Sequence, residues 1–583
     1  MNRVSRFAGL EQWCGPKDVR HGVRRAADVP GCAAGVVVDG CHLTLTDVAR
    51  VARGGVGAHL STDPRVRSRI ERSFQRLSEL VDAGAPVYGV TTGFGDSVRR
   101  HIDPGSAAML QKRLIEFLGC GSGASLSVPA ARAVMLIRAN NLARGYSGVR
   151  AELIERLLAF LNAGITPVIP EEGSVGASGD LVPLSYVAAA LTGQRTVQFG
   201  ARIVGAAEAL AEVGLEPFEL APKEGLGLIN GTAFMTGIAA LACLDARRLA
   251  RIADLCTALT VEVLGGITTP FHPFLHDVAK PHPGQIRSAA NTRTWLTGSG
   301  LGRHYEDVVA QVNAAGSGPR EDLTQIQDHY SIRCAPHFTG VLWDVLDWVS
   351  RWLETEINAS TDNPLLDPAT GEVFSGGNFS GGHVAMAMDS LKAAVASVAD
   401  LLDRQLALVV DEKFNRGLGP NLVPAFFADD PEFGLNHGFK GMQLACSSLT
   451  ADALSRGMPV SAFSRSTECH NQDKVSMGTT AARQARDVIE IVERVAAIHV
   501  LALCQAADLR GRQHLGRAAT IHAKIRAKIP FVDHDRAMDR DIATVVDMIR
   551  TDTLLNDTTS PPDKTVLGEG TDLAEASTYH NET

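Results

Sequence analysis

The chain has 583 residues and a formal net charge of −9, with 45% hydrophobic and 21% charged residues. A chain of this length exceeds what one hydrophobic core usually organises, so we expect two or three packed regions. The mildly acidic balance argues against nucleic acid or an anionic membrane as the main partner. Aromatic residues make up only 5%, which disfavours stacking platforms for single-stranded nucleic acid.

Ten cysteines are scattered along the chain without a CxxC pair. The sequence therefore indicates neither a zinc site nor a disulfide framework, and it favours reduced thiols in a cytoplasmic protein. No segment has the length and apolarity of a transmembrane helix. Residues 1–34 are rich in arginine, but Trp13, Cys14 and Pro16 interrupt any amphipathic face, which favours a flexible extension over a transit peptide.

The first predicted elements are short. Residues 36–38 and 43–45 flank Asp39-Gly40, which predicts a β-hairpin. The start signal at residues 61–64, followed by apolar residues at helical spacing, predicts a helix that ends near Gly84. Residues 86–101 contain three glycines and no helical period, which predicts a functional loop.

From about residue 107 onward the pattern is mainly that of long helices. Residues 234–264 are apolar almost all round, so this helix should be buried on most sides. Apolar residues also recur at helical spacing over 391–409 and 488–501. We therefore predict a mainly α fold, a long-helix bundle with a small N-terminal α/β region, which also packs against sister subunits. The expected divisions are an N-terminal domain at 35–232, a central bundle at 233–510, and a C-terminal helical region with a polar tail at 511–583.

The strongest chemical signal lies at Ala177-Ser178-Gly179. Because Ala177 and Gly179 are small, the amide nitrogen of Gly179 can approach the carbonyl carbon of Ala177. Ring closure and loss of the Ser178 hydroxyl as water would leave an exocyclic methylidene, an electrophile that no standard side chain supplies. Asp180 could assist as a nearby acid or base.

The helix expected to start near Pro183 would direct positive partial charge towards this site. A plainer interpretation of the tripeptide is an N-cap of that helix. For Ala-Ser-Gly alone, a capping role of Ser178 or Asp180 is the commoner case. The context favours chemistry. The segment ASGDLVPLSYVA resembles the signature of the ammonia-lyase and aminomutase family, whose cofactor is methylidene-imidazolone (MIO). Further family motifs follow in family order: VYGVTTGFG (87–95), GLINGT (near 226–232), QDHYSIRCAPH (327–337), NASTDNPL (358–365), SGGNFSGG (375–382) and HNQDKVSMG (470–478).

The resemblance assigns roles in removing a β-proton while ammonia leaves from the α-carbon. It implies that Tyr88 is the base, and since an ordinary tyrosine pKa is about 10, a positive neighbour or a helix N-terminus must lower it. Arg333 would bind the substrate carboxylate through its bidentate fork. Tyr330, on the same helix face, would lie near the electrophile and relay a proton, and Asn230 and Gln327 match positions that contact the carboxylate or the MIO carbonyl.

A second group of residues is expected to determine which substrate ring the enzyme accepts. Phe117-Leu118 stands where phenylalanine lyases often carry Phe-Leu and where histidine and tyrosine lyases often carry Ser-His. An apolar pair favours an unsubstituted ring, because a phenol or imidazole would lack a hydrogen-bond partner. Phe379 matches a position that lines the aromatic pocket, and Glu468 and Gln472 match the pair found in phenylalanine lyases. For each of these residues a purely structural role is the alternative. Asn363 and Asn378 would hold the backbone of the site, again with a purely structural role as the alternative.

The resemblance thus implies an enzyme that converts an aromatic L-amino acid, with phenylalanine the first choice, to a trans-arylacrylate and ammonia. The alternatives are a 2,3-aminomutase that makes a β-amino acid, a histidine ammonia-lyase, and a non-enzymatic helical assembly protein. His337 and His383 depart from the pattern, and either in the pocket would favour a hydroxylated or heteroaromatic ring. The resemblance also implies a homotetramer whose sites draw on three chains, with MIO made from residues 177–179 and no metal.

Overall fold

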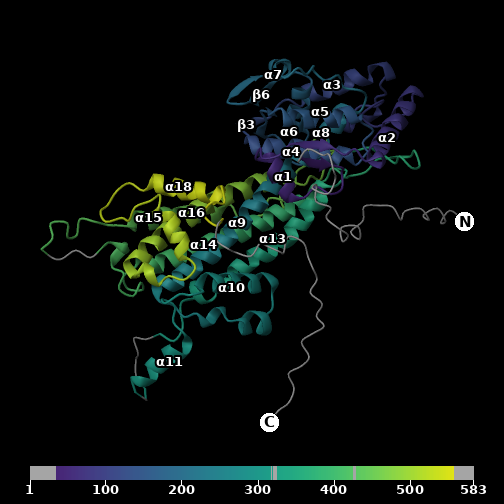
Figure 1. The fold of residues 1–583 in the computed structure, drawn as a ribbon. Coiled ribbons are helices and arrows are strands. Elements are labelled where there is room, and N and C mark those ends of the chain that lie inside the picture. Colours follow the sequence, from purple (N-terminus) through teal and green to yellow (C-terminus); the bar gives the residue numbers. More distant parts are fainter. Residues whose placement is uncertain (1–34, 317, 320–324, 425–428, 557–583) are drawn as a thin grey trace, which may run out of the picture.

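The computed structural model describes residues 35–316, 318–319, 325–424 and 429–556. The expected N-terminal extension and most of the polar tail lie outside these residues. The described chain is mainly α-helical, as expected, and consists of a body of long helices with a smaller N-terminal part at one end (Figure 1).

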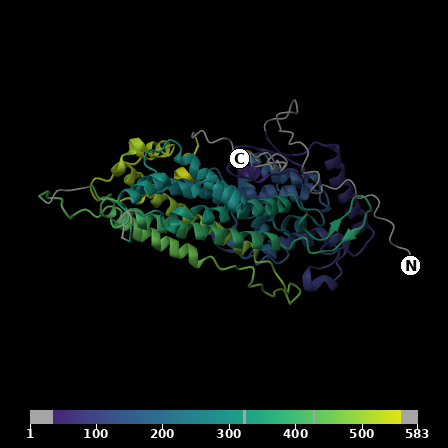
Figure 2. The same ribbon diagram turned by 90° about the horizontal axis from the view of Figure 1, so that it is seen from below.

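The body is organised around one buried helix, α9 (Ala233–Leu264). Its side chains are buried on nearly all sides, which confirms the prediction from its apolar composition. Around it pack α13 (Ala335–Ile357), α14 (Gly382–Val410) and α16 (Gly478–Arg510). Figure 2 shows these helices running side by side along the length of the molecule. Shorter helices flank and extend the body: α10 (Pro283–Leu296), α11 (Tyr305–Ala314), α12 (Tyr330–Arg333), α15 (Lys440–Ser455), α17 (Ala519–Arg526) and α18 (Asp539–Arg550).

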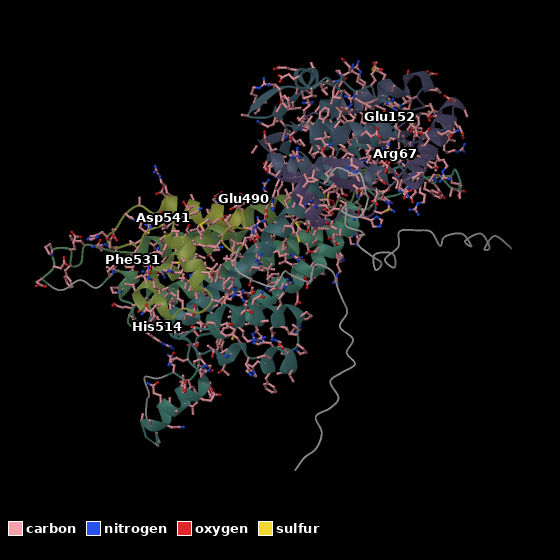
Figure 3. The ribbon with its side chains drawn as sticks, viewed as in Figure 1. Arg67, Glu152, Glu490, His514, Phe531 and Asp541 are labelled. Carbon is pink, nitrogen blue, oxygen red and sulfur yellow. The ribbon has the colours of Figure 1, made fainter. Side chains whose placement is uncertain are left out.

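The N-terminal part combines helices with small sheets. Its helices are α1 (Leu45–Ala52), α2 (Pro64–Asp82), α3 (Ala107–Phe117), α4 (Val128–Ala143), α5 (Ala151–Asn162), α6 (Leu181–Leu191), α7 (Ala206–Glu212) and α8 (Glu224–Ile229). β3 (Ser122–Ser125) pairs with β5 (Pro170–Glu172), and β4 (Ile165–Pro167), β6 (Thr196–Phe199) and β7 (Arg202–Gly205) form a three-stranded antiparallel sheet. A further pair, β8 (Leu365–Leu366) and β9 (Val373–Phe374), comes from the loop between α13 and α14. Figure 3 places the charged side chains of Arg67 and Glu152 on the N-terminal part and those of Glu490 and Asp541 on the body.

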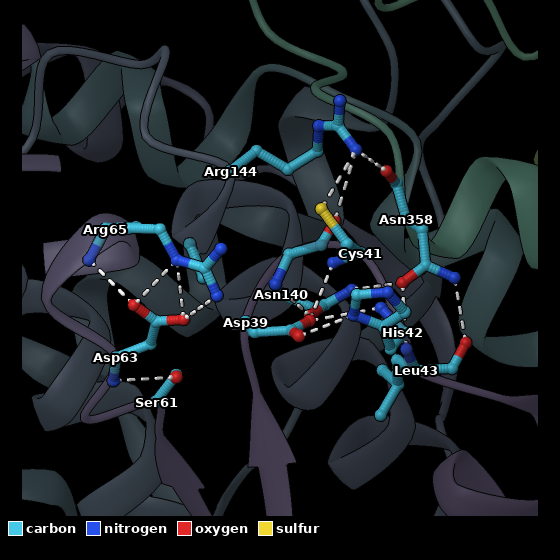
Figure 4. A network of polar contacts seen from close by, with 12 residues as sticks. Asp39, Cys41, His42, Leu43, Ser61, Asp63, Arg65, Asn140, Arg144 and Asn358 are labelled. Atoms are coloured by element: carbon cyan, nitrogen blue, oxygen red, sulfur yellow. Dashed lines mark hydrogen bonds and ion pairs between the residues drawn. The ribbon is translucent and has the colours of Figure 1, made fainter. Parts of the chain in front are cut away.

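The predicted hairpin near Asp39 is wrong. β1 (Val36–Val38) pairs in parallel with β2 (Ala58–Leu60), and α1 crosses between them, as a parallel pair requires. The side chain of Asp39 accepts hydrogen bonds from the amides of Cys41 (2.8 Å) and His42 (3.0 Å) and turns the chain away from a returning strand. Asn140 and Asn358 then hold this turn from other elements (Figure 4). By contrast, the helix predicted after residues 61–64 is confirmed as α2.

Candidate active site

The Ala177-Ser178-Gly179 turn lies between β5 and α6, next to the N-terminus of α9. Ser178 and Gly179 have φ angles of 51° and 75°, in the left-handed region that disfavours residues with a Cβ. Gly179 pairs with Gly231, and the amide of Asp180 donates to the Gly231 carbonyl oxygen at 2.8 Å. A Cβ on Gly179 would lie 2.1 Å from that oxygen. The turn therefore accepts only glycine at 179 without backbone movement.

Two carboxamides hold Ser178 from opposite parts of the chain. The Nδ2 group of Asn230 donates to the Ser178 carbonyl oxygen at 2.9 Å. The Nε2 group of Gln472 donates to the Ser178 hydroxyl oxygen at 3.0 Å. Of the residues predicted from sequence, Asn230 and Gln472 thus directly contact Ala177-Ser178-Gly179, which we call the triad.

Asp180 is fully buried beside the turn. Its carboxylate accepts hydrogen bonds from Ser174 Oγ (2.8 Å), from Thr479 Oγ1, and from the amide of Met235 (2.9 Å) in the first turn of α9. Burial raises the pKa of Asp180 to about 6, against the lowering effect of these hydrogen bonds. Although Asp180 precedes α6, its side chain does not cap that helix. It accepts a hydrogen bond from the first turn of α9 instead. This carboxyl group can therefore hold or release a proton close to Ser178 near neutral pH.

Tyr88 lies in the glycine-rich loop, where its hydroxyl oxygen accepts a hydrogen bond from the amide of Gly95 at 2.9 Å. The carboxylate of Glu468 accepts from the next amide, that of Asp96, at 2.9 Å. Burial raises the pKa of Tyr88, the Gly95 hydrogen bond lowers it, and the nearby Glu468 charge raises it again, so that the net shift is upward. The lowering expected from the sequence is thus absent among the described residues of a single chain.

The residues predicted to contact the substrate ring lie around the same end of α9. The carbonyl oxygen of Leu118, at the end of α3, accepts from Ser185 Oγ of α6 at 3.2 Å. Leu118 is buried, whereas Phe117 is 63% exposed. Phe379 is half-buried and precedes Gly381, which lies against Met235 at the start of α9.

Gln327, Tyr330 and Arg333 lie at the opposite end of α9. The Arg333 guanidinium lies over the Tyr330 ring, 4.6 Å from its centroid, as their helical spacing predicts. Nearby, Asp328 accepts a hydrogen bond from the amide of Ile267, which follows the C-terminus of α9. A helix of 32 residues is about 48 Å long at 1.5 Å per residue. A single chain therefore divides the predicted site into two distant groups.

The two histidines left open by the sequence lie outside the contacts described above. His337 has an unpartnered buried Nδ1 among the described residues, and its ring lies 5.5 Å from that of His276. His383 stacks edge-on against Trp352 at 4.9 Å. Among the described residues, the ring contacts of His337 and His383 are thus to His276 and Trp352, and neither of these two partners belongs to the predicted site.

Sequence reasoning missed a set of buried polar residues behind Asn230: Arg138, Ser147, Lys223, Thr361 and Asp362. The sequence did contain one signal for this set, the charge of Arg138 within the apolar stretch VMLIRANN, because a buried charge must find polar partners.

Within the described ranges, no three or more His, Cys, Asp or Glu side chains gather in a way that would hold a metal ion. Among the described helices we find none whose length and apolar character would let it span a lipid bilayer.

The described chain is thus a bundle of long helices whose central member, α9, begins beside the Ala-Ser-Gly turn. The family model described as aromatic amino acid lyase matches residues 43–528, and the chain belongs to this family. It is 40% identical to a histidine ammonia-lyase of Gloeobacter violaceus, over 88% of this chain and 95% of the relative. It is 39% identical to a tyrosine ammonia-lyase of Cupriavidus metallidurans, over 92% of this chain and 98% of the relative. Among solved structures, the tyrosine aminomutase of Streptomyces globisporus superposes with a TM-score of 0.85 at 37% identity, over 89% and 98% of the two chains.

Proposed function

We propose that this enzyme is an ammonia-lyase that eliminates ammonia from an aromatic L-amino acid, with phenylalanine the first choice and trans-cinnamate the product. The observation that carries the proposal is the pair of carboxamides on Ser178 within a turn that requires glycine at 179. When formed from residues 177–179, MIO would supply an electrophilic methylidene that binds the substrate nitrogen and makes ammonia a good leaving group.

The residues around the turn fit this group. The amide nitrogen of Gly179 would bond to the carbonyl carbon of Ala177, whose oxygen leaves as water, and the Ser178 hydroxyl would leave as a second water together with the Cα proton of Ser178. Asp180 can accept or return a proton during these steps because burial holds its pKa at about 6. Asn230 would remain on the Ser178 carbonyl oxygen, which becomes the ring carbonyl.

Completion of the site requires a second copy of the chain. Arg333 is suited to the substrate carboxylate because its planar fork donates two parallel hydrogen bonds, yet it lies at the far end of α9 from Ser178. We assign the second group, Gln327, Tyr330 and Arg333, to a neighbouring copy in a homotetramer. Apolar side chains exposed on the body support such packing, with Leu444 70% and Val341 54% exposed.

Assembly of the subunits would also lower the pKa of Tyr88, the proposed base. Tyr88 would remove the β-proton, for which its phenolate is needed, while burial and Glu468 raise its pKa in a single chain. The positive charge of Arg333 from a second copy would favour the phenolate. Tyr330 of that copy would serve as a proton relay, and Glu468 would be available for the substrate amine.

The choice of phenylalanine rests on Phe117, Leu118 and Phe379. These side chains offer no hydrogen-bond partner to a phenol or an imidazole, and leaving such a group unpaired in a pocket disfavours tyrosine and histidine. Two of the relatives are named for histidine and tyrosine, so the ring is the most informative point to test. The likeness to a tyrosine aminomutase favours a 2,3-aminomutase as the second candidate.

A panel of aromatic amino acids with chiral product analysis tests this proposal. The expected result is ammonia and trans-cinnamate from L-phenylalanine, with kcat/KM higher than for tyrosine or histidine. A β-amino acid as the main product would establish the mutase, and urocanate from histidine alone would reject the phenylalanine assignment. Borohydride, which reduces a methylidene, should abolish the activity. Tyr88→Phe should nearly abolish turnover in a protein that still folds.

A further inference from the structure

Arg138 is a fully buried cation on α4 that the proposed chemistry leaves unused. Its guanidinium donates to the carbonyl oxygen of Asn230 (2.8 Å), to that of Gly227, and to Thr361 Oγ1 (3.2 Å). All three acceptors are uncharged. A buried charge without a direct carboxylate partner is costly to the fold, so its presence calls for a functional explanation.

Arg138 lies near one buried ion pair, that of Asp362 with Lys223. Burial lowers the pKa of Arg138 to about 10, with the Asp362 charge opposing the shift, so the guanidinium stays charged at neutral pH. Asp362 is already bound to Lys223 Nζ (2.8 Å) and to Ser147 Oγ (2.8 Å). Asp362 is therefore already paired with Lys223, and the direct partners of Arg138 are the uncharged groups named above.

The unit lies directly behind the connection between α8 and α9, residues 230–232, which we call the strap. On one side, the Asn230 carboxamide and the Gly231 carbonyl hold Ser178 and Asp180. On the other side, a Cβ at Gly231 would lie 2.5 Å from Nη1 of Arg138. The strap is thus enclosed between the triad and the guanidinium.

Building on the proposed function, we infer that Arg138 is a positioning residue for the reaction. By binding the Asn230 carbonyl oxygen it fixes the strap, so that the Asn230 carboxamide meets the Ser178 carbonyl oxygen. Lysine would keep the charge but, as a compact ammonium, could not reproduce the planar fork that reaches three acceptors.

Arg138→Lys tests the inference, and Arg132→Lys is the matched control. Arg132 is also buried on α4 and also donates to backbone carbonyls, those of Val51 and Leu161, but it contacts no residue of the strap. The measurements are thermal unfolding, the intact mass of the peptide that carries the triad, and kcat and KM for L-phenylalanine per dehydrated subunit.

The expected result is a kcat lower on the order of a hundredfold for Arg138→Lys, as for an ångström-scale displacement of a reacting group, with a smaller change in KM. Arg132→Lys should lose comparable stability and keep its kcat. Equal kcat values in the two variants would overturn the inference.

If Arg138→Lys does not fold, Thr361→Val replaces it, with Thr361→Ser as its control. A lower kcat only for Thr361→Val supports the inference, and equal values overturn it. A wild-type protein whose triad shows no loss of water would refute the proposed function itself, so the two failures are distinguishable.

Discussion

Replacing Gly179 by alanine tests the turn on which the proposed chemistry depends. The new Cβ would lie 2.1 Å from the carbonyl oxygen and 2.3 Å from the carbonyl carbon of Gly231. These are backbone atoms of the strap, which Arg138 and Thr361 enclose from behind, so they cannot move away as a flexible side chain would. Residue 179 must also keep a φ near 75°.

The stability lost in Gly179→Ala has two contributions. A left-handed φ costs a residue with a Cβ about 1–2 kcal/mol. Forcing an extra methyl group into a packed site costs about 1–3 kcal/mol more. Gly200→Ala separates the two, because Gly200 has a φ of 59° and no atom within 4 Å of its ideal Cβ. Gly179→Ala should therefore lose about 1–3 kcal/mol more stability than Gly200→Ala.

Urea unfolding of the two variants measures this difference, and intact mass of the triad peptide reports ring closure. We expect Gly179→Ala to be the less stable variant and to retain the water that the wild type loses, because the displaced residue 179 can no longer bring its nitrogen to Ala177. Gly200→Ala should dehydrate normally. Equal stabilities, or full dehydration of Gly179→Ala, would refute the reasoning from the Gly231 contact.

Three further predictions concern the base, the buried ion pair and the substrate ring. Glu468→Gln removes a charge that raises the pKa of Tyr88, so the acidic limb of the kcat/KM profile should move to lower pH. A limb that stays in place or moves upward would contradict Tyr88 as the base under Glu468 control. Lys223→Met removes the direct ion-pair partner of the buried Asp362 and should cost about 3–5 kcal/mol of stability in urea unfolding. The double variant with Asp362→Leu should recover part of that loss, and no recovery would reject the pair as its cause. Leu118→His offers a hydrogen bond to a phenol and should raise the tyrosine-to-phenylalanine ratio of kcat/KM by about tenfold. An unchanged ratio would place residue 118 outside the ring pocket.

Helices α9, α14 and α16 were predictable because their apolar periodicity records the environment along each element. The triad was equally accessible, since its chemistry depends on three adjacent residues and their small size. The prediction of a hairpin at Asp39 was wrong because it depended on residues that are not neighbours along the chain. Its partner strand is β2 rather than the nearest apolar run, and side chains from α4 and from the end of α13 hold the intervening turn.

The amino-acid sequence by itself determined the helical class, the buried central helix and the candidate electrophile, because each of these depends on residues that are neighbours along the chain. Only the tertiary structure decided which distant residues meet. It joined Asn230 and Gln472 at Ser178, placed Arg138 behind the strap, and separated Arg333 from the triad by the length of α9. Such contacts depend on how elements pack across separations of up to about three hundred residues, and local sequence patterns do not record that packing.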